Sequence, residues 1–287
     1  MNKSENIEQH WDEEIKPSSK LLELRLGEVW KYRDLLFLFV KRDFTAQYKQ
    51  TILGPLWHFI QPIFTTLMFL LVFKKIANIS TDGIEPILFY MSGFAIWNYF
   101  SSCLTATSST FTANSGIFGK VYFPRLVIPL STVISQLIKF GIQFLLLLIA
   151  MIYYGIKEGH FYINISWLLV PILLLMMALL GLGLGIIISS LTTKYRDFTV
   201  LITFAVQLLM YATPIVYPLS FLKSKGYAWL VMYNPLSPIV EAFKYALFGV
   251  GSFTATQLIY SAIFIIITLM IGLITFNKVE RNFMDTV

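Results

Sequence analysis

The sequence predicts an all-α integral membrane protein with six transmembrane helices, an N-terminal amphipathic helix in the membrane interface and a re-entrant outer segment before the last helix. Hydrophobic residues make up 56% of the 287 residues, and charged residues make up only 13%. That charged share is about half of what a soluble domain carries. The mean hydropathy is +0.69, and apolar stretches of the length that a bilayer requires recur along the chain. These values exclude a disordered chain and argue against a soluble enzyme.

Residues 1–20 are polar and rich in acidic side chains. No basic region followed by an apolar core is present there, so the pattern is not that of a cleavable signal peptide. We expect residues 1–20 to form a mobile cytosolic tail.

Residues 21–50 have the pattern of an amphipathic helix. Basic residues such as Arg42 lie opposite the apolar side, and the continuous apolar run of residues 35–40 is too short to span a bilayer. A basic amphipathic helix lying in the membrane interface fits this pattern, and packing against a soluble partner is the alternative. The aromatic residues on the apolar side are Trp30, Phe37, Phe44 and Tyr48.

Six long apolar stretches form an expected transmembrane domain, residues 54–277. The expected spans are 54–74, 86–111, 126–154, 166–191, 198–218 and 257–277. Between the last two, residues 219–250 are apolar but interrupted by Asn234, Pro235 and Pro238. We interpret 219–250 as re-entrant, because non-helical backbone at membrane depth must be buried in protein or face a water-filled cavity.

The distribution of Lys and Arg predicts that both termini face the cytosol. With that orientation, 15 of the 22 basic residues lie inside and six outside, and Lys139 lies within the third span. Cytosolic loops carry such an excess of positive charge. Residues 278–287 are then a second cytosolic tail. We read the net charge of +6 as a signal of topology and not of nucleic-acid binding.

The second span is unusually aromatic in its first half and rich in hydroxyl groups in its second half. Sugars suit such a wall, because their C–H faces stack on aromatic rings and their hydroxyl groups find polar partners. Helix packing and an aromatic interface belt are the alternatives. The candidate residues of a polar conduit are Tyr90, Trp97, Phe100, Ser101, Thr105 and Ser108.

The apolar segments also contain a lysine, a group of glycines and a pair of opposite charges. Lys139 should face protein, water or an anionic group, because a lipid-exposed charge is costly. The glycines within 181–185 indicate close helix packing, or a hinge. Glu241 and Lys244 are spaced to share one helix face and form either a local ion pair or part of an outer gate.

Motifs for catalysis are missing from the sequence. Residues 116–121 lack the GxxxxGK[ST] spacing of a phosphate-binding loop, and neither GxSxG nor HExxH occurs. A single cysteine, Cys103, and three scattered histidines offer no metal site. We therefore expect no catalytic, cofactor-binding or metal-binding residues in this chain, which cannot hydrolyse ATP by itself.

The loop between the second and third spans has an odd composition for a cytosolic loop. Apolar side chains alternate there with glycine and lysine, and exposed apolar clusters of this kind mark partner surfaces. Anchoring in the membrane interface is the alternative. The candidate residues for contact with an energy-supplying partner are Gly116, Phe118, Lys120, Tyr122 and Arg125.

Several segments together resemble the permeases of polysaccharide ABC exporters, the type-two exporters for O-antigen, capsule or teichoic acid. The resemblance covers most of the chain from about residue 22 onward. Lys244 departs from it, since the family often carries Arg there, and the acidic tail has no counterpart. The matching segments are RDFTAQYKQTILGPLWHFIQP at 42–62, NSGIFGKVYFP at 114–124, YRD at 195–197, the Asn234–Tyr245 region and FNKVERNFMD at 276–285.

The resemblance implies a permease homodimer in a bacterial cytoplasmic membrane, working with two separate ATPase subunits that bind ATP and Mg²⁺. Its substrate would be a lipid-linked glycan moved outward between the protomers. Residues 112–125 would be the coupling element, and residues 219–250 would form the outer gate, with Asn234, Pro235, Glu241 and Lys244.

Two other functions remain open from the residues alone. An ion-coupled secondary transporter places ionisable groups near the midplane, where this chain has only Lys139. A membrane-embedded transferase acting on lipid-linked sugars needs acidic or His side chains as a base or as metal ligands. An ATPase gene beside this one would distinguish both from the ABC permease.

Overall fold

The computed structural model describes residues 26–49, 51–118, 120–121, 123–159, 164–226 and 228–286, and these form helices and no strands. The predicted all-helical class is therefore confirmed for this part of the chain. The expected tail 1–20 lies outside the described residues.

The described helices follow one another along the chain as α1 (Leu26–Lys31), α2 (Arg33–Tyr48), η1 (Gly54–Leu56), α3 (Trp57–Phe69), the π-helix η2 (Leu70–Ile76), α4 (Pro86–Ser108), α5 (Thr110–Ala113), α6 (Ser115–Phe118), α7 (Val127–Glu158), η3 (Ile165–Leu168), α8 (Leu169–Thr192), α9 (Phe198–Tyr211), α10 (Leu219–Ser224), α11 (Ala228–Met232), α12 (Leu236–Phe248) and α13 (Ala255–Thr286).

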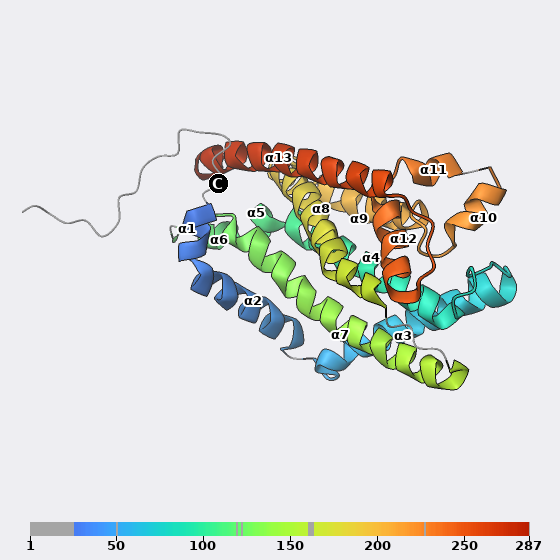
Figure 1. Ribbon diagram of the computed structural model, residues 1–287. Coiled ribbons are helices and arrows are strands. Elements are labelled where there is room, and N and C mark those ends of the chain that lie inside the picture. The colour runs from blue at the N-terminus through green and yellow to red at the C-terminus, as the bar shows by residue number, and fades with distance from the viewer. Residues whose placement is uncertain are drawn as a thin grey trace, which may run out of the picture.

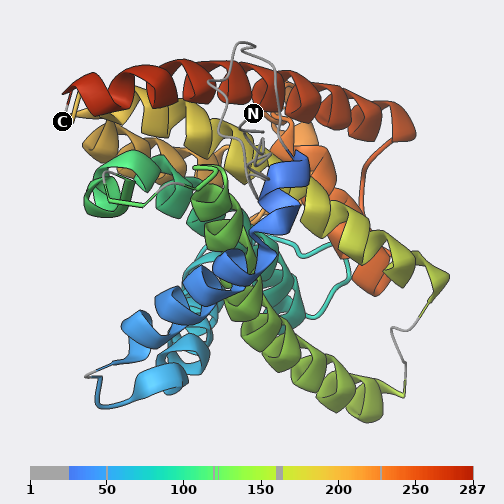
Figure 2. The ribbon, with the colours of Figure 1, turned by 90° about the vertical axis from the view of Figure 1, so that its left-hand side faces the viewer.

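Helix α4 is the centre of the bundle. It packs against α3, α7, α8, α9 and α12, while α13 lies on the far side of α8 (Figures 1 and 2). Most of its side chains are buried, from Leu88 to Ser108. Because protein surrounds α4, its hydroxyl groups do not need to face lipid.

Four described helical segments are long and apolar enough to cross a membrane. They are Gly54–Ile76, Val127–Glu158, Ile165–Thr192 and Ala255–Glu280, which coincide with the expected spans one, three, four and six. The expected second span is α4, whose polar residues lower its hydropathy. The expected fifth span, 198–218, forms a shorter helix that ends at Tyr211, because Pro214 and Pro218 disfavour helix there.

Glycines set the spacing between α8 and its two neighbours. A Cβ atom on Gly181 would lie 2.8 Å from the Cβ of Cys103, and one on Gly185 would lie 2.6 Å from the Cβ of Thr107, both on α4. On the opposite side, a Cβ on Gly272 of α13 would lie 2.9 Å from the carbonyl oxygen of Gly183. The structure thus supports close packing as the role of these glycines.

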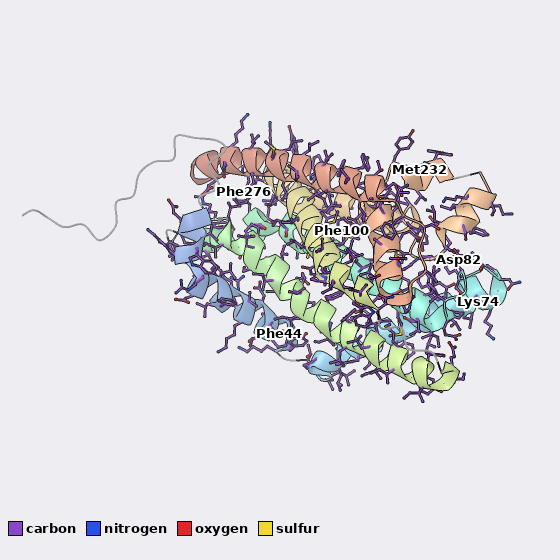
Figure 3. The ribbon with its side chains drawn as sticks, in the orientation of Figure 1. Phe44, Lys74, Asp82, Phe100, Met232 and Phe276 are labelled. Atoms are coloured by element: carbon purple, nitrogen blue, oxygen red, sulfur yellow. The ribbon has the colours of Figure 1, made fainter. Side chains whose placement is uncertain are left out.

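The bundle has two distinct ends. Helix α1, the short helices α5 and α6, and the C-terminal part of α13 with Phe276 gather at one end, while Lys74, Asp82 and Met232 lie at the other (Figures 1 and 3). The first and last described helices therefore end on the same side of the molecule.

The amphipathic segment 21–50 forms α1 and α2 within its described part. Leu36, Phe39 and Val40 are buried, and α2 packs along α7. Trp30 and Phe37 are 70% and 62% exposed, whereas the rings of Phe44 and Tyr48 contact each other edge to face at 4.6 Å. One side of α2 thus packs on protein, and large apolar side chains project from another.

We predict that Gly185→Ala destabilises the bundle by about 1–3 kcal/mol, because the new methyl group overpacks the contact with Thr107. Gly141→Ala is the matched control, since a Cβ on this helical glycine of α7 meets nothing within 4 Å. The unfolding temperature in detergent measures the difference. Equal unfolding temperatures for the two variants would refute the role assigned to Gly185.

Candidate functional site

The aromatic residues expected to line a conduit lie inside the bundle. Tyr90 and Phe100 are fully buried and Trp97 is 3% exposed. The rings of Trp97 and Phe100 lie 5.5 Å apart. In this arrangement the three side chains stabilise the interior of one chain and line neither of the two cavities described below.

The hydroxyl groups of α4 are largely satisfied by their own helix. Ser101 donates to the carbonyl oxygen of Asn98, Thr105 to that of Ser101, and Ser108 to that of Thr105. Serine and threonine commonly bond within a helix in this way. Of Ser101, Thr105 and Ser108, only Ser101 borders the polar cavity described next.

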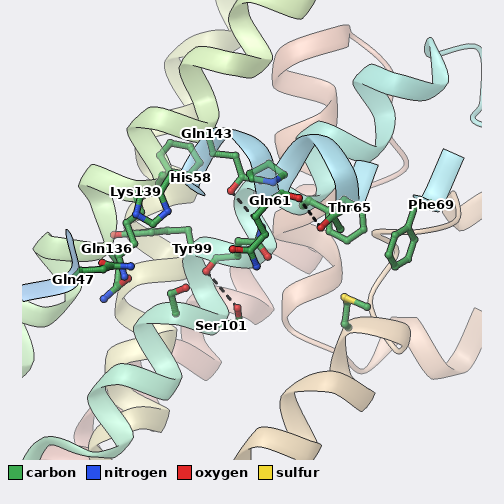
Figure 4. Close-up of a pocket in the computed structure, with 16 residues that line it drawn as sticks. Gln47, His58, Gln61, Thr65, Phe69, Tyr99, Ser101, Gln136, Lys139 and Gln143 are labelled. Atoms are coloured by element: carbon green, nitrogen blue, oxygen red, sulfur yellow. Dashed lines mark hydrogen bonds between the residues drawn. The ribbon is translucent and has the colours of Figure 1, made fainter. Parts of the chain in front are cut away.

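A polar cavity of about 510 Å³ lies beside α4, on the side that Ser101 faces (Figure 4). Its walls come from α2, α3, α4, α7 and α9. Its lining contains one charged residue, Lys139, and no carboxylate. Amide, hydroxyl and imidazole groups dominate the wall: Gln47, His58, Gln61, Thr65, Asn98, Tyr99, Ser101, Ser102, Gln136 and Gln143.

A second cavity of about 380 Å³ shares Gln47, Gln136 and Lys139 with the first. It extends from these residues to Arg42 on α2 and to Asn114 in the loop before α7. The two cavities therefore adjoin at these residues. Together we call them the polar track, which extends from the α5–α6 end of the bundle toward its middle.

Helix α7 supplies a stripe of polar side chains to this track. Thr132, Gln136, Lys139 and Gln143 are spaced three or four residues apart, so they share one face of the helix, and each borders one or both cavities. Of these four residues, only Lys139 was expected from the sequence to stand out. The periodicity of the three neighbouring polar residues within an apolar span was the signal that could have found the others.

The loop 114–125 is more buried than the sequence suggested. Phe118 and Phe123 are 4% and 5% exposed, so the expectation that they form an exposed cluster is wrong. Phe118 packs on Phe111 and Phe123, with ring centroids 5.9 Å away in each case, and Phe111 stacks on Phe276 of α13 at 4.6 Å. These rings hold the loop against the bundle.

Other residues of this loop are accessible. Gly116 and Lys120 are exposed, and Val121 is 60% exposed. Tyr122 lies outside the described residues. The exposed surface of the loop is therefore centred on Lys120 and Val121.

Arg125 fastens the loop to the last helix. Its guanidinium donates to the carbonyl oxygen of Glu280 at 2.6 Å and lies 3.9 Å from the Glu280 carboxylate. It also lies 5.5 Å from the centre of the Phe118 ring. Burial lowers the pKa of Arg125 from its usual value, and Glu280 acts in the opposite direction.

The outer segment contains a buried charged pair. The Lys244 ammonium donates to the carbonyl oxygen of Pro214 at 2.6 Å, lies 3.6 Å from the Glu241 carboxylate and sits 3.8 Å from the centre of the Phe89 ring. Glu241 in turn accepts from the backbone N–H of Ser252 at 3.0 Å. Thus the pair connects α12 with the turn after α9, with α4 and with the segment before α13.

Asn234 and Pro235 join the same elements. The Asn234 amide donates to the carbonyl oxygen of Ala212 and to the Thr213 hydroxyl, at 3.0 and 2.9 Å, and its oxygen accepts from the N–H of Leu236 at the start of α12. The Ser261 hydroxyl of α13 donates to the carbonyl oxygen of Pro235 at 2.7 Å. The structure therefore brings the four residues that were expected to form a gate into one connected region.

Apolar helices long enough to cross a membrane surround the polar track, which is an arrangement typical of membrane transport proteins. Residues 34–248 match the ABC-2 type transporter family. Because this match covers most of the chain, the protein belongs to the ABC-2 type transporter family.

The chain is also similar to named permeases over nearly its whole length. It is 28% identical to the O-antigen export system permease protein RfbA of Klebsiella pneumoniae over 254 residues, which are 88% of this chain and 94% of that protein. It is 25% identical to the polysialic acid transport protein KpsM of Escherichia coli, over 86% of this chain and 93% of KpsM. Identity is 22% to the capsule polysaccharide export inner-membrane protein CtrC of Neisseria meningitidis serogroup B, over 87% and 92% of the two chains.

We predict that Lys244→Met destabilises the protein by about 3–5 kcal/mol, because the Glu241 carboxylate is left buried without its cation. The double variant Glu241→Gln/Lys244→Met should recover much of this loss. Lys223→Met on α10 is the control, since Lys223 is exposed. Denaturation in detergent gives the stabilities of the unchanged protein, of Lys244→Met, of Glu241→Gln, of the double variant and of the control. Strictly additive effects of the two single changes would show that the pair is not coupled.

Proposed function

We propose that this chain is the membrane subunit of an ATP-driven exporter that moves a lipid-linked polysaccharide out across the bacterial cytoplasmic membrane. The observation that carries the proposal is the similarity to O-antigen and capsule export permeases over nearly the whole chain. The polar track supports it, because a glycan needs hydrogen-bonding groups along a path through hydrocarbon.

Energy for export would come from a separate ATPase. The sequence holds no phosphate-binding loop, so ATP and Mg²⁺ would bind to two copies of a partner subunit, and this chain would act as a permease without enzymatic activity. Two copies of the chain would form a homodimer with the glycan path between them. Exposed apolar side chains on α3 and α9, such as Phe64 and Phe204, are available for such contacts or for lipid.

We further propose six spans with both termini in the cytosol. Helix α4, enclosed by other helices, would be the second span, and α9 with the turn after it would be the fifth. The common end of α1 and α13 (Figure 1) and the excess of basic residues in the expected cytosolic segments support this topology. Residues 219–250, including α10, α11 and α12, would form the re-entrant outer gate.

The proposed path follows the cavity-facing side of α4. Ser101 borders the cavity directly, while Tyr90, Trp97 and Phe100 would support its wall from within and be reached by a glycan only after the helices separate. The outer gate would be stabilised by the contacts of four residues, Asn234, Pro235, Glu241 and Lys244. The exposed aromatic side chains Trp30 of α1 and Phe37 of α2 would lie in the membrane interface.

The coupling surface would be the exposed part of the loop 114–125. Gly116, Lys120 and Val121 would be accessible to an ATPase. Phe118 would transmit its movement to Phe276 of α13 through the intervening ring of Phe111, and Arg125 would transmit it through Glu280. This division of roles replaces direct docking by Phe118.

Export in cells tests the proposed function. Deleting the gene should abolish surface polysaccharide, and restoring it should require a catalytically intact partner ATPase. The variant Lys120→Glu/Val121→Asp should reduce both export and co-purification of the ATPase, the latter at least about fivefold, which corresponds to about 1 kcal/mol of binding free energy.

Two further variants separate docking from folding. Phe118→Asp should lower the stability of the permease itself, because it places a charge among buried rings. Lys223→Glu, at the opposite end of the molecule, should leave co-purification unchanged. Normal export and normal ATPase retention in Lys120→Glu/Val121→Asp would refute this coupling surface, and unaltered surface polysaccharide after gene deletion would refute the proposed function.

Cysteine labelling tests the topology. In a Cys103→Ala background, Tyr233→Cys and Gly249→Cys should react with a membrane-impermeant thiol reagent from outside, since both positions are exposed. Val121→Cys should react only after the cytosolic side is opened. Labelling of Tyr233→Cys or Gly249→Cys from the cytosolic side alone would mean that the span count is wrong.

A further inference from the structure

Lys139 lies in the polar track without a directly paired carboxylate among the described residues, although Asp43 of the smaller cavity acts on its charge from beyond 4 Å. Within the described part of the chain its ammonium makes no ion pair within 4 Å, and the larger cavity has no carboxylate in its lining. The smaller cavity contains Asp43, but that carboxylate accepts two hydrogen bonds from Arg42, at 2.8 and 2.9 Å. A cation without a direct ion pair in an apolar bundle is costly and indicates a functional site.

Hydrogen-bonding groups around Lys139 are also incompletely used. The Gln136 carbonyl oxygen and the His58 Nε2 atom are buried and have no hydrogen-bond partner. The Asn98 amide reaches Gln143 at 3.3 Å, a long contact. Figure 4 shows Gln47, His58 and Gln136 gathered near Lys139, with Gln61 and Gln143 close by. Buried polar atoms normally have partners, so these groups point to a polar ligand. Toward an anion, the Gln136 side chain would donate through its amide N–H and His58 through its imidazole N–H, since the amide oxygen only accepts.

We propose that this cavity binds a phosphate group of a membrane amphiphile, with Lys139 as the cationic contact. A lysine ammonium acts as a point charge toward phosphate. A tetrahedral phosphate presents oxygens in several directions, and the amide and hydroxyl groups here come from α2, α3, α4 and α7, which surround the cavity.

The position of the cavity favours an amphiphile over a free ion. One wall includes Gln47 at the end of α2, the helix whose exposed Phe37 side chain we place in the membrane interface. A phosphate attached to a lipid is held at that depth by its own hydrocarbon chain. The inference rests on the proposed export function for its link to transport, since the phosphate that joins a glycan to its lipid would belong to this class.

Binding of labelled farnesyl diphosphate to the purified full-length permease in detergent tests the site. Lys139→Gln should weaken binding at least about tenfold, while Lys139→Arg, which keeps the charge, should stay within about threefold of the unchanged protein. Lys157→Gln, an exposed lysine on the same helix, is the control and should bind normally. Equal affinity in Lys139→Gln and Lys157→Gln would overturn the proposal.

Competitors identify the source of the phosphate. Displacement by inorganic diphosphate would show that the phosphate groups suffice, displacement by phosphatidylglycerol would indicate a phospholipid, and resistance to both would indicate an isoprenoid-linked phosphate. Displacement by farnesol, which lacks phosphate, as effective as by farnesyl diphosphate would also overturn the proposal. If Lys139→Gln elutes as an aggregate, Gln136→Leu tests the same cavity without changing its charge and should also weaken binding, whereas unchanged binding in a folded Gln136→Leu would count against it.

The assay requires neither ATP nor a polymer, so its result is independent of the export experiment. Loss of the binding site with intact export would remove only this inference. A permease that binds farnesyl diphosphate through Lys139 but supports no surface polysaccharide would contradict the proposed function and leave the site in place.

Discussion

The close approach of α8 to α4 and α13 is the contact on which the bundle depends. Glycines within 181–185 remove the Cβ atoms that would collide with α4 on one side and with α13 on the other. In a membrane the helices gain little from hydrophobic association, because lipid is as apolar as their side chains, so packing and hydrogen bonds must hold them together. Here both operate, since the Thr192 hydroxyl also donates to the carbonyl oxygen of Ser108.

This tight layer leaves the polar track on the other side of α4. Ser101 and Asn98 face it, while Trp97 and Phe100 fill the interior. Helix α4 thus lies between the closely packed layer of α8 and α13 on one side and the two polar cavities on the other. Lys139 lies where the two cavities meet. It is the one charged residue in the lining of the larger cavity, whereas Arg42 and Asp43 also line the smaller one.

The two ends of the bundle are fastened by different chemistry. At the α5–α6 end, aromatic rings and Arg125 tie the loop to α13. At the outer end, the Lys244–Glu241 pair and Asn234 connect α12 with the turn after α9 and with α4. Both arrangements join segments far apart in the sequence, as the proposed transmission of movement between the two membrane surfaces would require.

The sequence by itself determined the helical class, the four long apolar segments and the family motifs, because hydropathy and residue spacing are local properties of the chain. It also identified the glycines within 181–185 as packing residues and Lys139 as out of place in lipid. Only the tertiary structure decided which aromatic residues are exposed. Phe118 reads as a surface residue beside Gly119 and Lys120, yet contacts with Phe111 and Phe123 bury it. The larger polar cavity likewise forms only where five helices meet. The residues that a side chain contacts on other helices cannot be read from the sequence of its own helix.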